Sequence, residues 1–283
     1  MPIFAHRDSR VICQGMLNEQ EFFWVHQCIL SGTQVAAWVK AGEGGGERLA
    51  IPVFDSVREA RRQTSASISL VSVVPALAAD ALIEAIESGI ELIICLTSGI
   101  PSKDMIDVYQ VLQHQSASRL IGPGSCGIIT PLQCKAGLMP SYAFTPGEVG
   151  MISCSDTLGY EAAWKITSSG SGQSTFVGLG GDAFAGTSIV DVLCEFEADS
   201  HTESVLLVLQ SGLYGIESVA DWASKERHKP LFAIVAGHSL PALSYCPAVV
   251  DQPFDGAAIV QALRKAGVTI VDNLSLIGSK ELS

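Results

Sequence analysis

The residues best suited to chemistry follow an apolar stretch near the middle of the chain. Residues 149–152 have the composition of a buried strand, and residues 153–157 supply turn and helix-capping types before a segment with helical spacing. The free backbone N–H groups at such a helix start favour a phosphate or a carboxylate. We therefore predict an anion site at Ser155, Asp156 and Thr157. The alternative is that these residues are ordinary helix caps.

Three other residues are candidates for catalysis. Cys154 comes just before the predicted helix start, where the helix dipole would lower the pKa of a thiol; the alternative is a buried cysteine at a strand end. His238 follows a predicted strand at 230–236, and Ser125 lies in a Gly-Ser-Cys-Gly turn that could form the floor of a polar pocket. No base, acid or orienting group accompanies His238 in the sequence, so the alternative is a polar residue at a strand end.

The composition excludes several classes of protein. A net charge of -12 argues against binding to nucleic acid, because phosphate backbones require concentrated Lys and Arg. No apolar run approaches the length of about 18 residues that a membrane span needs. The first ten residues are polar and charged, so we expect no secretory signal and a cytoplasmic location. Eight cysteines without a Cys-x-x-Cys pair predict reduced, mostly buried thiols and no metal site.

Strands and helices alternate along the whole chain, which predicts an α/β protein with mainly parallel sheets and right-handed crossovers. We predict a Rossmann-like domain at 1–130, a linker at 131–147 and a flavodoxin-like domain at 148–283. In the first domain, the predicted strands are 11–14, 34–39, 51–54, 68–74, 91–96, 119–122 and 126–129, and the predicted helices are 21–30, 56–62, 78–88 and 104–115. In the second domain, the predicted strands are 149–153, 174–178, 204–209, 230–236 and 269–271, and the predicted helices are 158–168, 188–198, 215–226 and 254–266.

Short phrases along nearly the whole chain match one family in the right order. They are residues 11–15, 52–54, 57–60, 84–86, 99–101, 121–123, 127–131, 170–174 and 178–182. Through them the chain resembles the α subunit of succinyl-CoA synthetase, the NDP-forming succinate–CoA ligase. The resemblance implies a CoA-binding-type first domain, a ligase-type second domain, coenzyme A as cofactor and an ATP-grasp β subunit as partner. The CoA-type site that it implies comprises Gly15, Asn18, Glu43, Pro75, Ser98, Gly99 and Ile100.

The phosphate-binding loops depart from the family pattern. The family has a Gly-x-x-Gly-x-x-Gly loop after the first strand, and here Asn18 and Glu21 stand at its second and third glycines. Glu43 replaces a lysine between two glycines in the next loop. A Cβ atom hinders close approach of the backbone to a phosphate, and a carboxylate repels it. We therefore predict a degenerate CoA-type site, and the binding of coenzyme A remains open.

The phosphohistidine of the family also has no counterpart. The family passes phosphate through a histidine in a Gly-His-Ala-Gly loop, and residues 246–250, which correspond to it, contain no histidine. The glutamate that supports this histidine is replaced by Gln210. We therefore expect a non-catalytic or repurposed homologue, because a fold does not by itself carry the chemistry.

Two alternatives remain open. One is an active subunit of an ATP-dependent acyl-CoA synthetase-like complex, acting with an ATP-grasp β partner on a small carboxylate. The other is a ligand-binding module for a small neutral or cationic molecule. Self-association is a further possibility for the partner, and whether the chain is an enzyme stays undecided at this level.

Overall fold

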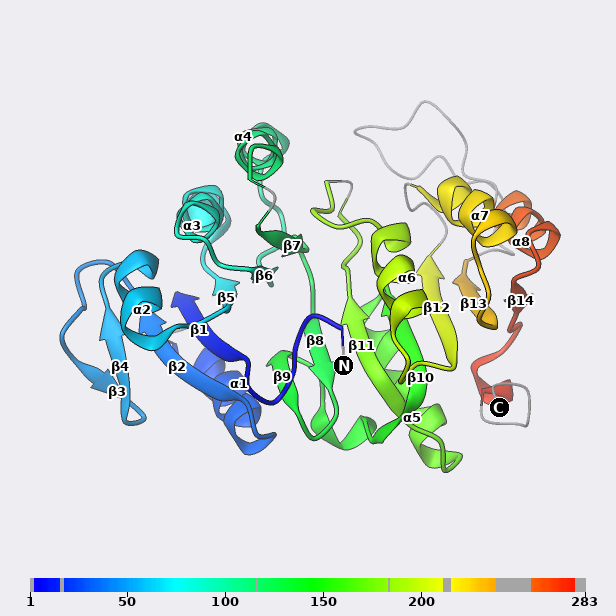
Figure 1. Ribbon diagram of the computed structural model, residues 1–283, viewed down its shortest axis with the longest axis horizontal. Helices are drawn as coiled ribbons and strands as arrows, with labels where there is room; N and C mark the ends of the chain where they lie inside the picture. The colour runs from blue at the N-terminus through cyan, green and yellow to red at the C-terminus, as the bar shows by residue number, and fades with distance from the viewer. Residues whose placement is uncertain are drawn as a thin grey trace. The chain divides into compact units, whose positions relative to one another are not determined.

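The computed structural model describes residues 3–15, 18–115, 117–182, 184–210, 215–237 and 256–277. The chain forms two compact units. Figure 1 colours the chain by residue number, by which the segments of each unit can be found. The first comprises 2–141 with 177–187, and the second comprises 142–176 with 188–283. The chain contains two mainly parallel sheets, which confirms the predicted fold class.

The first sheet has the strand order of a dinucleotide-binding fold. The short strand β3 is antiparallel to its neighbour. When the six parallel strands are numbered along the chain, their order across the sheet is 3-2-1-4-5-6, which is the Rossmann arrangement. The order reverses between β1 and β5, and ligands of such sheets bind at this point, beyond the carboxyl ends of the strands. Across the sheet the strands are β3 (Glu47–Arg48), β4 (Ile51–Phe54), β2 (Gln34–Val39), β1 (Arg10–Gly15), β5 (Ile68–Ser72), β6 (Leu92–Cys95) and β7 (Arg119–Ile121).

Four helices pack on the first sheet, with α1 on one face and the other three on the opposite face (Figure 1). The apolar sides of α2, α3 and α4 pack on the sheet in one buried cluster that includes Leu82 and Ile86 of α3 and Ile93 of β6, each fully buried. The predicted helix at 21–30 begins two residues late, because Asn18 caps α1 and the helix starts at Glu19. The four helices are α1 (Glu19–Leu30), α2 (Val57–Thr64), α3 (Pro75–Glu87) and α4 (Ser102–Gln113).

The second sheet contains the five strands of the predicted flavodoxin-like domain. These strands lie in the order 2-1-3-4-5 of flavodoxin-like sheets, counted from β11. Helix α5 lies on one face and α6 to α8 on the other (Figure 1). The strands are β10 (Pro146–Ser153), β11 (Gln173–Gly178), β12 (Ser204–Gln210), β13 (Leu231–Ala236) and β14 (Thr269–Ile270), and the helices are α5 (Asp156–Ser168), α6 (Ile189–Ala198), α7 (Ile216–Lys225), α8 (Gly256–Lys265) and the short 3-10 helix η2 (Leu274–Leu276).

The segment around the predicted linker contains regular structure. Strand β8 (Gly127–Thr130), which we predict to complete the first domain, belongs to the second sheet. It pairs antiparallel with β9 (Cys134–Gly137), which lies inside 131–147 together with the 3-10 helix η1 (Ser141–Ala143). A two-stranded hairpin satisfies the backbone hydrogen bonds of this segment. The domain limits 1–130, 131–147 and 148–283 therefore stay a prediction.

Two observations concern the whole of the described chain. Of its helices, none combines the length and the apolar composition that a membrane crossing requires. Its cysteines are free thiols, and Cys194 is the one that is exposed among them. Burial of the others agrees with their predicted role as small apolar residues.

Candidate functional site

The predicted cofactor residues follow the carboxyl ends of four strands in the first sheet. Gly15 ends β1, Glu43 follows β2, Pro75 follows β5, and residues 98–100 follow β6. Parallel strands end at the same edge of a sheet, so the fold brings these positions to one side of the first unit. Pro75, Ser98 and Gly99 are exposed there, whereas Ile100 is 7% exposed and belongs to the core.

The backbone conformation at position 15 requires a glycine. Its φ angle is +87°, and a Cβ atom at this position would lie 2.2 Å from the carbonyl oxygen of Ser72 at the end of β5. A side chain would therefore clash as well as strain the backbone. The first glycine of the predicted loop is thus explained by packing between β1 and β5, at the point where the strand order reverses.

The start of α1 is closed by its own side chains. The Asn18 carboxamide oxygen accepts a hydrogen bond from the backbone N–H of Glu21 at 2.9 Å. In return, the Glu21 carboxylate accepts from the backbone N–H of Asn18 at 3.1 Å and from the Ser72 hydroxyl at 3.2 Å. This capping box engages N–H groups at the helix start that could otherwise point at an anion, and it adds a negative charge.

The glycine loop after β2 is closed in a similar way. One carboxylate oxygen of Asp55 accepts hydrogen bonds from the backbone N–H groups of Gly42 at 2.7 Å and of Gly44 at 2.9 Å. A Cβ atom on Gly44 would lie 2.5 Å from the other Asp55 carboxylate oxygen. The loop therefore uses its N–H groups and its lack of side chains to hold an internal carboxylate.

Glu43 is held by two basic neighbours. Its carboxylate lies 2.5 Å from the Lys40 ammonium and 2.9 Å from the Arg48 guanidinium. The hydrogen bond from Lys40, with the charges of Lys40 and Arg48, lowers the pKa of Glu43. Both cations that could attract a phosphate to this loop are thus paired with an acid.

Ser125 has a structural role in this arrangement. Its side chain is buried, and its hydroxyl donates to the carbonyl oxygen of Gly178 at 2.5 Å and accepts from the backbone N–H of Gly127 at 2.8 Å. The hydroxyl proton is therefore engaged inside the protein. Sequence reasoning identified a polar group here but could not identify Gly178, which lies 53 residues further along the chain.

Cys154 directly follows β10 and is a protonated thiol. Burial raises its pKa to about 12, so the predicted lowering of this pKa is wrong. Burial destabilises the thiolate form more than the dipole of α5 stabilises it. Gln210, at the end of the neighbouring strand β12, donates from its amide nitrogen to the Cys154 carbonyl oxygen at 3.3 Å.

The predicted anion site lies at the start of α5, beside the point where the order of the second sheet reverses. Ser155 is the cap residue with extended backbone, and its side chain makes no capping hydrogen bond. The backbone N–H of Ser155 donates to the Ser153 hydroxyl at 3.2 Å. Asp156 occupies the first helical position and Thr157 is exposed. The helix start thus exists as predicted, with an acid in its first turn; its use as an anion site stays a prediction.

The third catalytic candidate, His238, and residues 246–250 lie outside the described residues. Within the described part of the chain, no three His, Cys, Asp or Glu side chains gather in a way that could hold a metal ion.

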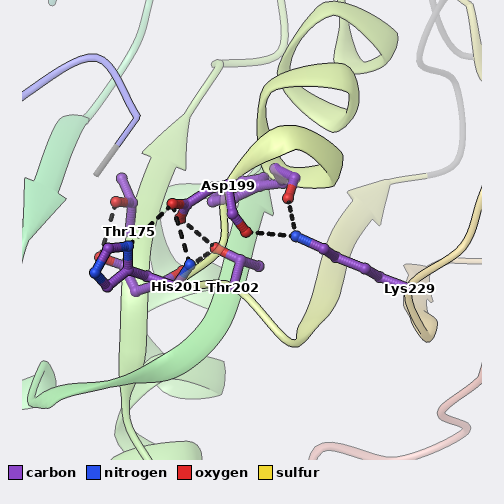
Figure 2. A network of polar contacts seen from close by, with 7 residues as sticks. Thr175, Asp199, His201, Thr202 and Lys229 are labelled. Carbon is purple, nitrogen blue, oxygen red and sulfur yellow. Dashed lines mark hydrogen bonds and ion pairs between the residues drawn. The ribbon is translucent and has the colours of Figure 1, made fainter. Parts of the chain in front are cut away.

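A buried polar network between α6 and β12 has no counterpart in the sequence predictions (Figure 2). The Asp199 carboxylate, which is almost fully buried, accepts from the Thr202 hydroxyl at 2.8 Å and from the backbone N–H of His201 at 3.2 Å. Burial opposes ionisation of Asp199, but the hydrogen bonds from Thr202 and His201 outweigh it and lower its pKa. The Lys229 ammonium donates to the carbonyl oxygens of Phe196 and Asp199. The network caps the carboxyl end of α6.

Comparison with known proteins agrees with this architecture. A CoA binding domain matches residues 6–99, and a CoA-ligase domain matches residues 152–276. The α subunit of ADP-forming succinate–CoA ligase from Aquifex aeolicus is 41% identical, over 98% of this chain and 93% of the relative. The corresponding subunit from Staphylococcus epidermidis is 36% identical, over 99% of this chain and 93% of the relative.

Two solved structures share the fold. ATP citrate lyase from Methanothrix soehngenii superposes with a TM-score of 0.80 at 19% identity and covers 98% of this chain. The dinucleotide-forming acetyl-coenzyme A synthetase 1 of Ca. Korarchaeum cryptofilum gives 0.79 at 17% identity over 96% of this chain. The chain spans only 49% and 60% of these two proteins. At such identities the likeness concerns the fold alone.

A Rossmann-like CoA-binding-type domain followed by a flavodoxin-like ligase domain defines the class of α-type CoA-ligase subunits. Within this class, the sequence identity with the two relatives over 93% of their length shows the family: the chain belongs to the succinate–CoA ligase α subunits.

Proposed function

We propose that this chain is a divergent member of its family that keeps the fold without the phosphohistidine reaction, as a non-catalytic or repurposed α-type subunit. The observation that carries the proposal is the closed start of α1. Glu21 places a carboxylate on the Asn18 N–H and on the Ser72 hydroxyl, at the switch point where the family resemblance places coenzyme A phosphates. A pyrophosphate would have to displace this carboxylate or bear its repulsion.

Two features of the sequence support the same proposal. Residues 246–250 hold no histidine to carry phosphate, and Gln210 stands where the family has a supporting glutamate. Gln210 is exposed, and its amide nitrogen donates to the Cys154 carbonyl oxygen. A neutral amide does not favour a phosphorylated or protonated imidazole as a carboxylate would. A partner such as an ATP-grasp β subunit, or a second copy of this chain, would then be bound for assembly or regulation.

A second function is favoured by the extent of the family match. Identity of 41% over nearly the whole of an α subunit favours an active subunit that works with an ATP-grasp β partner on a small carboxylate. Such an activity would need a phosphoryl acceptor other than the family's histidine, or a direct use of an acyl phosphate. Coenzyme A would be its cofactor.

A labelling experiment separates the two functions. The chain is incubated with a family β subunit, magnesium and ATP labelled at the γ-phosphate, and a bacterial succinate–CoA ligase α subunit serves as the positive control. We expect no acid-labile label on this chain and no succinate-dependent or acetate-dependent acyl-CoA formation. Acid-labile, alkali-stable label that disappears in His238→Ala would overturn the non-catalytic proposal and support the second function.

A further inference from the structure

A basic hollow lies on the first unit at the edge of the sheet opposite to the predicted cofactor residues. Its volume is about 600 Å³. Ser65 lies shortly before the start of β5 and Glu91 directly before the start of β6, so the hollow is at the amino ends of these strands. Its main lining residues are Arg58, Arg61, Arg62, Ser65, Ser88 and Glu91.

The three arginines all come from α2 and are not neutralised by acids. Within the part of the chain that the structure describes, no carboxylate lies within ion-pair distance of Arg58, Arg61 or Arg62. The Arg61 guanidinium lies against Gly89, where a Cβ atom would be only 3.3 Å from one of its terminal nitrogens. A chain with a net charge of -12 thus gathers three unpaired cations in one hollow.

Ser88 supplies an independent sign of a ligand. It caps the carboxyl end of α3 and lines the same hollow, with 9% of its surface exposed. Its hydroxyl is buried and has no hydrogen-bond partner among the described residues. Buried hydroxyls in native proteins are nearly always paired, and an unpaired one destabilises the fold. An acceptor atom of a ligand in the hollow would satisfy it.

We propose that this hollow is a binding site for a phosphate group, carried by a phosphate monoester or a diphosphate. Guanidinium groups present several N–H donors in a planar fork, and they bind tetrahedral oxyanions through more than one oxygen. Arg61 and Arg62 take two oxygens, Arg58 adds charge at the rim, and the Ser88 hydroxyl donates to a further oxygen. This site is distinct from the family's cofactor site, and it does not depend on the function proposed above.

Glu91 sets the limit of this electrostatic attraction. Glu91 lines the hollow with the arginines, and its carboxylate makes no ion pair within the described residues. It repels an anion, so the site holds a phosphate less strongly than three arginines alone would. Replacing Glu91 therefore tests the site with the opposite sign to replacing an arginine.

The structural alternative is that the arginines only compensate the dipole of α2. Arg61 and Arg62 lie in its last turn, where cations stabilise a helix. In that case their loss would lower the stability of the protein, and phosphate would bind no better to the wild type than to the variants. Lys265 provides a matched control, because it is an exposed cation in the last turn of α8.

The test is calorimetric titration of the full chain with inorganic phosphate and with pyrophosphate, with chloride at equal ionic strength as the blank. We expect saturable binding of phosphate or pyrophosphate, weakened about tenfold or more by Arg61→Gln and by Arg62→Gln, since hydrogen bonds to charged groups are the strong ones. Glu91→Gln should tighten binding, and Lys265→Gln should leave it unchanged. Thermal unfolding without phosphate measures the stability of each variant.

Ser88→Ala gives the sharpest distinction. It removes an unpaired hydroxyl, so it should not lower the unfolding temperature without phosphate, yet it should weaken phosphate binding several-fold. No saturable binding to the wild type, or equal binding to the wild type and Arg61→Gln, would overturn the proposal. So would an unfolding temperature that rises equally with chloride and with phosphate.

Discussion

Glu21→Gln tests whether an internal carboxylate keeps coenzyme A phosphates from the start of α1. Asn18 and Ser72 donate to different oxygens of the Glu21 carboxylate. Glutamine keeps the length and one acceptor oxygen for the Asn18 N–H, its amide nitrogen can donate to the Ser72 hydroxyl oxygen in place of the second contact, and the charge is removed. Two unit charges about 4 Å apart repel each other by about 1 kcal/mol in water and about 4 kcal/mol near a protein surface. Relief of about 1.4 kcal/mol corresponds to a tenfold gain in affinity.

The assay is calorimetric titration of both proteins with coenzyme A at low and at physiological ionic strength. We expect weak or undetectable binding to the wild type and tighter binding, by about tenfold or more, to Glu21→Gln. The difference should shrink as salt is raised, because exposed charges are screened over about 8 Å at 0.15 M. The variant should lose about 1 kcal/mol of stability, since neutral hydrogen bonds at a helix start are weaker than charged ones.

Glu19→Gln is the matched control. Glu19 is an exposed acid in the same helical turn and makes no hydrogen bond in the capping box. Its replacement should change the affinity much less than that of Glu21. Micromolar binding of coenzyme A to the wild type, unchanged in Glu21→Gln, would refute the reasoning that this carboxylate blocks the site.

Three further predictions concern buried groups. Ser125→Ala should lose about 1–3 kcal/mol of unfolding free energy in denaturant titration, because two buried backbone groups lose their partner; an unchanged midpoint would contradict this role. Cys154 should resist alkylation by iodoacetamide at pH 8 in the folded protein, since burial raises its pKa to about 12, and rapid modification would contradict this. The pKa of Asp199 is lowered in the folded state, so its contribution to stability is present above its unfolded pKa of about 3.9 and is lost as the pH falls through the folded pKa. Asp199→Asn should therefore destabilise the protein at pH 7 and much less at pH 2, as measured by chemical denaturation; an equal loss at both values would refute the ionised state.

Local periodicity was sufficient to predict most of the fold. The predicted strand at 34–39 has the same bounds as β2, and the predicted helix at 158–168 differs from α5 by two residues at its start. Alternation of such elements also predicted mainly parallel sheets, because successive strands joined through helices by right-handed crossovers run parallel. The membership of β8 in the second sheet could not be predicted, since a four-residue apolar strand carries no sign of its neighbour.

The start of α1 shows a signal that was present in the sequence and was not used. Asn18 followed three residues later by Glu21 is a capping pattern that a sequence can reveal. Comparison with the family loop directs attention to the missing glycines instead. The capping pattern and the missing glycines concern the same two residues. In the structure, Asn18 and Glu21, which stand at the family's glycine positions, cap α1.

The sequence by itself determined the α/β class, the family and the absence of a histidine in residues 246–250, because these depend on residue types and on their order along the chain. The tertiary structure decided which groups accept from the backbone N–H groups at the start of α1 and in the glycine loop after β2. Ser72 reaches Glu21 across 51 residues, and Asp55 reaches Gly42 across 13. The tertiary structure also decided that burial, rather than the helix dipole, determines the pKa of the Cys154 thiol. Hydrogen-bond partners and desolvation depend on distance in space, and a linear pattern does not specify that distance.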